Sequence, residues 1–136
     1  MPRVVIDTNV FISSFFGGVP RKIIDLWKDG KITLCLSQEI VEEYIEVLGR
    51  LGIEEKEIKE LTRLFSEGYH SIFTAKTPKL SVVMDDPDDN KFIECAVSLE
   101  CKVIISGDRH LQSVKKYIDV VILSPREFLD RFVHFF

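Results

Sequence analysis

Four short apolar runs divide the chain, and each is rich in β-branched or other bulky apolar residues. They cover residues 4–6, 32–36, 103–105 and 118–123, the last with one acid inside it. Runs of this length suit strands that are buried on both faces of a parallel sheet. We therefore predict a strand at each of them.

Between the runs the apolar residues recur every three or four positions, which is the period of an amphipathic helix. Ser37 fits an N-cap, and Ser124 and Glu127 have the spacing of a capping box. Residues 69–84 are the least clear stretch, a loop with a short helix or strand. The predicted helices cover 20–28, 38–48, 54–67, a segment that begins at Asp88 or Asp89, and one that opens at Ser124 and runs toward Phe136. Alternating strands and helices predict an α/β sandwich around a parallel sheet.

Length and composition agree with one packed domain over residues 1–136. The chain is 46% apolar with ten Phe and a net charge of −4, unlike a disordered chain. Acidic residues outnumber basic ones 22 to 18, which argues against a broad basic surface for non-specific nucleic-acid binding. Any contact with nucleic acid must be local or bridged by metal ions.

Features of the sequence also predict a cytoplasmic protein. Cys35, Cys95 and Cys101 are odd in number, lie in apolar segments and form no CxxC pair, so we expect buried thiols in a reducing compartment. The N-terminus has no charged leader followed by an apolar run. No stretch approaches the length of apolar sequence that a membrane span requires.

Acidic residues lie where ligands bind in open α/β sheets, beyond the carboxyl ends of the strands. Asp7 directly follows the first predicted strand, and Asp108 follows the third after Ser106 and Gly107. Asp89 begins the helix before that third strand, and Glu43 lies on the helix that leaves the second. Each acid alone has an ordinary interpretation as a cap, turn or surface residue. Their joint placement at one sheet edge indicates a functional site.

Two positions in this acidic set leave alternatives open. Helical periodicity places Glu43 at the border of the apolar face of its helix and points Glu42 away from it, which favours Glu43. In the acidic run 85–89, the site acid can also be a residue one or three positions away from Asp89.

Four carboxylates at one place would repel one another unless a cation lay between them. A ligand set of oxygen atoms, without Cys or His, favours Mg²⁺ or Mn²⁺ over zinc. Such ions activate water and stabilise the leaving oxygen in phosphodiester displacement. The pattern therefore predicts metal-assisted hydrolysis of a phosphate ester.

Five segments resemble the motifs of PIN-domain nucleases, in order along nearly the whole chain. They are VIDTNV at 5–10, SQEIVEEYIEVLGR at 37–50, DPDDNKFIECA at 86–96, SGD at 106–108 and SPREFL at 124–129. Among these nucleases the chain is most similar to the small prokaryotic branch that supplies the toxin components of toxin–antitoxin pairs.

The resemblance implies a three-layer α/β/α sandwich with a central parallel sheet of about five strands. It also implies an endoribonuclease dependent on Mg²⁺ or Mn²⁺, and an antitoxin protein as a partner. Asn9 and Ser106 match polar positions that support the first and last acids. The residues that match the acidic quartet, and would hold the metal, are Asp7, Glu43, Asp89 and Asp108.

A catalytically silent PIN-like module that binds RNA or protein is the alternative from another functional class. The intact quartet argues against it. Basic residues, among them Lys91, are candidates for contact with the RNA backbone, and Arg109 and His110 are favoured because they adjoin Asp108.

Three aromatic residues make the C-terminal end apolar: Phe132, Phe135 and Phe136. Packing of the last helix onto the sheet is the ordinary interpretation. A homodimer contact is the alternative, because exposed terminal aromatics would form an apolar patch.

Overall fold

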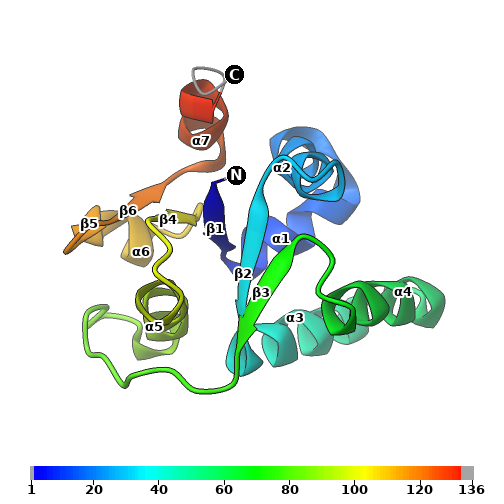
Figure 1. Ribbon diagram of the computed structural model, residues 1–136, viewed down its shortest axis with the longest axis horizontal. Coiled ribbons are helices and arrows are strands. Elements are labelled where there is room, and N and C mark those ends of the chain that lie inside the picture. Colours follow the sequence, from blue (N-terminus) through cyan, green and yellow to red (C-terminus); the bar gives the residue numbers. More distant parts are fainter. Residues whose placement is uncertain (1, 133–136) are drawn as a thin grey trace.

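A six-stranded sheet runs through the middle of the molecule (Figure 1), whose computed structural model describes residues 2–132. The strands lie in the order β3-β2-β1-β4-β6-β5. All neighbours pair in parallel except β5, which is antiparallel to β6. The strands are β1 (Arg3–Ile6), β2 (Thr33–Ser37), β3 (Ser71–Thr74), β4 (Val103–Ile105), β5 (Lys116–Tyr117) and β6 (Val120–Leu123). The predicted parallel sheet of about five strands is confirmed, and the two-residue β5 extends it.

Helices cover both faces of this sheet, which confirms the α/β/α sandwich. Helices α1 to α4 and α7 lie on one face, and α5 and α6 lie on the other (Figure 1). The helices are α1 (Thr8–Ser13), α2 (Gly18–Lys28), α3 (Gln38–Arg50), α4 (Glu55–Ser66), α5 (Asn90–Ser98), α6 (Arg109–Val114) and α7 (Pro125–Phe132), with 3-10 turns η1 (Ser14–Phe16) and η2 (Pro87–Asp89). None of these described helices combines the length and apolar character that crossing a bilayer requires.

The fourth apolar run differs from its prediction. Strand β6 begins at Val120, and Ile118 lies in the turn before it with a φ of 55° and 73% of its surface exposed. A left-handed backbone angle reverses the chain between β5 and β6, so Ile118 cannot continue a strand. The prediction of a strand from 118 was therefore wrong for its first two residues.

The C-terminal helix begins as its sequence predicts. The backbone N–H of Ser124 donates to Glu127 Oε1 at 3.0 Å, and the N–H of Glu127 donates to Ser124 Oγ at 3.1 Å, which forms the capping box. Phe132 is buried and its ring stacks on Phe128 with centroids 5.4 Å apart. Phe135 and Phe136 lie outside the described residues, so the homodimer contact stays a prediction.

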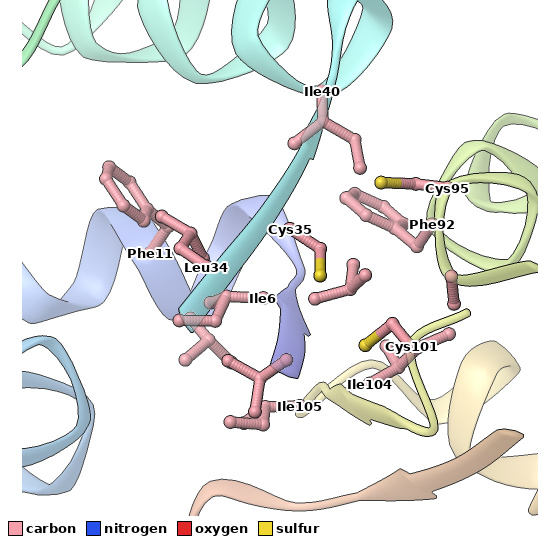
Figure 2. Packing of buried hydrophobic residues seen from close by; sticks show 14 of the residues in the cluster. Ile6, Phe11, Leu34, Cys35, Ile40, Phe92, Cys95, Cys101, Ile104 and Ile105 are labelled. Atoms are coloured by element: carbon pink, nitrogen blue, oxygen red, sulfur yellow. The ribbon is translucent and has the colours of Figure 1, made fainter. Parts of the chain in front are cut away.

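Successive side chains of β2 enter the two halves of the core (Figure 2). Leu34 points toward Phe11 on the side of α1, whereas Cys35 points to the opposite side of the sheet, where Phe92, Cys95 and Cys101 lie. The three cysteines are free and buried, which confirms that part of the prediction. Burial raises the pKa of the Cys95 thiol to about 12, so this side chain packs as a neutral apolar group.

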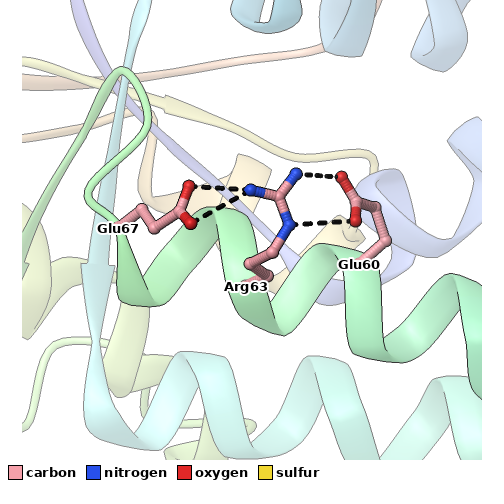
Figure 3. A network of polar contacts seen from close by, with 3 residues as sticks. All are labelled: Glu60, Arg63 and Glu67. Carbon is pink, nitrogen blue, oxygen red and sulfur yellow. Dashed lines mark hydrogen bonds and ion pairs between the residues drawn. The ribbon is translucent and has the colours of Figure 1, made fainter.

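The outer face of α4 is polar. Arg63 lies between Glu60 and Glu67 and forms ion pairs with both (Figure 3). All three side chains are more than half exposed, so water and salt screen these pairs and they contribute little to stability.

Tyr44 fastens α3 to the central strand. Its ring is fully buried and stacks on Phe11 with centroids 4.1 Å apart. Its hydroxyl donates a hydrogen bond to the carbonyl of Ile6, the last residue of β1. This contact fixes the position of α3, and with it Glu43, relative to Asp7.

We expect Tyr44→Phe to lower the free energy of unfolding by about 1–2 kcal/mol in urea denaturation, because it leaves the buried Ile6 carbonyl without this donor. Tyr117→Phe, on the edge strand β5, is the matched control and should change it by less than about 0.5 kcal/mol. Equal losses in the two variants would show that the Tyr44 hydroxyl has no special role.

Candidate active site at the carboxyl ends of β1 and β4

The order of the strands makes the end of β1 a topological switch point. Strand β1 lies between β2 and β4, because the chain builds the sheet first toward β3 and then returns to add β4 on the other side. Ligands bind at such a switch point in open α/β sheets, outside the carboxyl ends of the strands. Asp7 directly follows β1, and Ser106 directly follows β4.

Asp7 is held at this point by two hydrogen bonds. Its Oδ1 accepts from the backbone N–H of Val10 at 2.9 Å, which caps α1, and its Oδ2 accepts from the hydroxyl of Ser106. The side chain is buried, and burial raises the pKa of its carboxyl to about 6. The two hydrogen bonds oppose this shift, whereas the charges of Asp108 and Glu43 add to it.

Ser106 links the ends of the two central strands. Its hydroxyl is fully buried, donates to Asp7, and accepts from the backbone N–H of Asp108 at 2.9 Å. Asp108 in turn caps α6, since its Oδ1 accepts from the N–H groups of His110 and Leu111 at 2.8 and 3.1 Å. The geometry thus connects Ser106 with both Asp7 and Asp108.

Three carboxylates gather beside this link. One oxygen from each of Asp86, Asp89 and Asp108 lies within 4.8 Å of the other two. Burial, followed by the charges of Asp108 and Asp86, raises the pKa of Asp89 to about 7. Among the described residues, Asp89 Oδ2 is the one buried side-chain oxygen or nitrogen without a hydrogen-bond partner.

Asp86 belongs to this cluster although it is not one of the four predicted acids. The turn η2 follows it directly, and residues three apart in a 3-10 turn lie on the same side. Its spacing from Asp89, with Pro87 between them, is the signal in the sequence that could have identified it.

Glu43 faces the site and Glu42 does not. Glu43 Oε2 accepts a hydrogen bond from the Thr8 hydroxyl, and its Oε1 pairs with Lys91 Nζ at 2.7 Å. Glu42 is exposed and accepts from the amide of Gln38 at 3.0 Å. The structure therefore brings Glu43 beside Asp7 through Thr8, and Lys91 joins it there.

The remaining predicted residues lie at the margin of the site. Asn9 and Arg109 are exposed, and His110 is half-buried in the first turn of α6 after Asp108. Within residues 2–132, the side-chain hydrogen bonds of Asp7 come from Val10 and Ser106 and not from Asn9. The support of Asp7 by Asn9 and the contact of Arg109 and His110 with substrate stay predictions.

Asn90 anchors the loop that carries Asp86. Its Oδ1 accepts hydrogen bonds from the backbone N–H groups of Val82 and Val83, which precede Asp86 in the chain, at 2.9 and 2.8 Å. Its Nδ2 donates a hydrogen bond to the carbonyl of Pro87, the residue that follows Asp86, at 2.9 Å. One buried amide thus fixes the backbone on both sides of Asp86.

The donor set fits a hard divalent cation. Three carboxylate oxygens close together, one of them on a residue with a buried oxygen that lacks a partner, are ligands that Mg²⁺ and Mn²⁺ favour. No other such group of His, Cys, Asp or Glu occurs in the part of the chain that the structure describes. Burial is the largest cause of the raised pKa values of Asp7 and Asp89, and the charges of the neighbouring carboxylates add to it. A cation at this point would relieve that added repulsion.

The raised pKa values predict that stability without metal falls as pH rises. The folded protein keeps protons on Asp7 up to about pH 6 and on Asp89 up to about pH 7, whereas the ordinary value is 3.8. Because the folded state binds more protons between these limits, its free energy of unfolding decreases through that window. In EDTA near pH 7.5 we therefore expect Asp89→Asn to stabilise the protein by about 1–2 kcal/mol.

Thermal unfolding at several pH values tests this expectation. The gain in Asp89→Asn should vanish near pH 4 and shrink when Mn²⁺ is added to the wild type. Asp130→Asn, on the exposed side of α7, should show no such dependence on pH. A gain that is constant across the range would contradict the pKa shift of Asp89.

We expect Asn90→Ala to cost about 1–3 kcal/mol of unfolding free energy, because it leaves the N–H groups of Val82 and Val83 without their acceptor. Chemical denaturation measures this loss, with the exposed Asn9→Ala as control. Similar stabilities for the two variants would mean that other contacts hold the loop.

The chain is similar to known proteins in sequence and in fold. A family model described as PIN domain matches residues 3–110, a range that contains Asp7, Glu43, Asp86, Asp89 and Asp108. The uncharacterized protein MJ1680 of Methanocaldococcus jannaschii is 34% identical over 150 residues, which cover 98% of this chain and 93% of that protein.

Two solved structures share the fold at low sequence identity. PAE2754 from Pyrobaculum aerophilum is 14% identical with a TM-score of 0.57, covering 98% of this chain and 96% of the other. FitAcB from Neisseria gonorrhoeae is 15% identical with a TM-score of 0.52, covering 90% of this chain and 98% of the other.

Proposed function

Because this chain belongs to the PIN domain family, whose members are generally nucleases, we propose that it is a metal-dependent endoribonuclease that hydrolyses phosphodiester bonds in RNA. The observation that carries this proposal is the buried, unpartnered Oδ2 of Asp89 in a cluster with Asp86 and Asp108. A structural carboxylate would use such an oxygen in a hydrogen bond. A carboxylate that binds a cation keeps it available.

The acids of the site have different roles in this proposal. Asp89 and Asp108, joined by Asp86, hold Mg²⁺ or Mn²⁺, and Asp7 lies next to them. The bound cation supplies water activation and stabilises the charge that develops on the scissile phosphate. Ser106 keeps Asp7 and Asp108 at a fixed separation through its two hydrogen bonds.

Other side chains are candidates for contact with the RNA. Arg109 and His110 stand at the start of α6 beside Asp108, where they can contact the phosphate backbone. Asn9 lies on the exposed side of α1 close to Asp7 in the chain and is a candidate for holding substrate or Asp7. The overall negative charge confines such contacts to the site itself.

The biological role in this proposal is that of a cytoplasmic toxin in a toxin–antitoxin pair, acting as one domain over residues 1–136. The support is the order of its five motif segments, which resemble the small prokaryotic branch of the family. The same likeness supports an antitoxin protein that covers or disturbs the acidic site. A homodimer through the C-terminal aromatics belongs to the same proposal.

One observation favours a silent binding module instead. Glu43, an acid of the matched quartet, already has Lys91 as a counter-ion. A site in which this acid is neutralised could bind RNA or protein without cutting it. The nuclease requires a bound divalent metal ion, whereas the binding module does not.

Cleavage of a labelled structured RNA in Mg²⁺, Mn²⁺ or EDTA tests the proposal. We expect EDTA to abolish cutting, and Asp7→Asn, Asp89→Asn and Asp108→Asn each to lower the rate roughly 100-fold or more, because each removes negative charge at the cation or directly beside it. Glu42→Gln, one position from Glu43 but directed into solvent, is the control and should cut at the wild-type rate.

RNA binding without cleavage, unaffected by EDTA, would replace the nuclease by the binding module. Equal activity in the wild type and in Asp89→Asn would exclude the acidic cluster as the active site.

A further inference from the structure

Lys91 is a lysine with its charge enclosed among acids. It lies in the first turn of α5, and its Nζ is 2.7 Å from Glu43 Oε1 and 3.3 Å from Asp88 Oδ1. The Lys91 side chain is only 14% exposed and that of Glu43 24%. Lysines are seldom buried to this degree unless they are paired.

This pair differs from the other ion pairs of the described chain. The pairs of Arg63 on α4 join side chains of the same helix that are more than half exposed. The pair of Lys91 and Glu43 joins two helices, α5 and α3, in a place shielded from water. A partly buried pair is screened less by salt, and removing one partner leaves the other charge uncompensated.

Both oxygens of Glu43 are occupied, one by the Lys91 ammonium and the other by the Thr8 hydroxyl. The Asp89 carboxylate is different, because its Oδ2 has no partner among the described residues and lies in the cluster with Asp86 and Asp108. The acids of the site therefore fall into two groups. One is already neutralised by this chain, and the other is open to a cation.

We propose that Lys91 takes the place of a second metal ion in this site. Its ammonium group is the fixed counter-charge of Glu43, which keeps that carboxylate from ligating metal. The protein then binds one divalent cation, on Asp86, Asp89 and Asp108. This inference rests on the proposed function, since it concerns the same acidic site and sets its number of metal ions.

Calorimetric titration of the whole chain with Mn²⁺, without RNA, measures that number directly. We expect one ion for the wild type. Lys91→Met, which keeps the length of the side chain and removes its charge, should free Glu43 and raise the stoichiometry to two ions. Lys91→Arg should stay at one ion, because it restores the positive charge.

The double variant Lys91→Met with Glu43→Gln is the matched control and should return to one ion, since the acid that would hold the second ion is gone. Glu43→Gln alone should bind one ion with an affinity within roughly threefold of the wild type, as expected for a change of one charge that is not a ligand. Circular dichroism checks that each variant is folded, and Lys91→Gln replaces Lys91→Met if that variant is not.

A purely structural ion pair would alter the unfolding temperature and leave the stoichiometry at one in every variant, which would overturn the inference. Two ions on the wild type, or loss of binding in Glu43→Gln, would also overturn it. These outcomes are distinct from failure of the proposed function. A wild type that binds one Mn²⁺ and cuts no RNA would support the inference about Lys91 and contradict the proposed nuclease function. A wild type that binds two Mn²⁺ ions and cuts RNA would support the nuclease function and contradict the inference about Lys91.

Discussion

Repulsion between carboxylates crowded at one edge of the sheet is the constraint on which the rest of this structure depends. Asp7, Asp86, Asp89 and Asp108 are brought to one edge of the sheet, where burial and mutual charge raise the pKa values of Asp7 and Asp89. Separating them would lower the energy of the folded protein without a cation. The surrounding contacts therefore have to hold them together against that tendency.

Three buried side chains supply the restraint, and each forms a hydrogen bond with the backbone. Ser106 connects the acid after β1 with the acid after β4, and Tyr44 ties α3 to the end of β1. Asn90 fixes both sides of the loop that bears Asp86. Each is a short polar contact inside an apolar core, where low dielectric strengthens hydrogen bonds. The precision of the site is therefore a property of the core and not of surface loops.

The sequence was most informative where local pattern and tertiary position coincide. Asp7 and Asp108 could be predicted because an acid directly after a buried parallel strand reaches the sheet edge whatever the details of packing. Asp86 was predicted only as an alternative register of Asp89, and Lys91 only as a candidate for contact with RNA. Their places in the site depend on a 3-10 turn and on the approach of α5 to α3. Ile118 was misassigned for a related reason, since a turn overrides the strand preference of an apolar residue.

The site is assembled from segments far apart in the chain, and its last part arrives late. Strand β4 enters the sheet beside β1, and Ser106 and Asp108 follow it. Because synthesis runs from the N-terminus, Asp7 and Asp89 are made before Ser106 and Asp108, so this half of the site is missing until β4 has been made. Incomplete chains therefore cannot present the full set of acids.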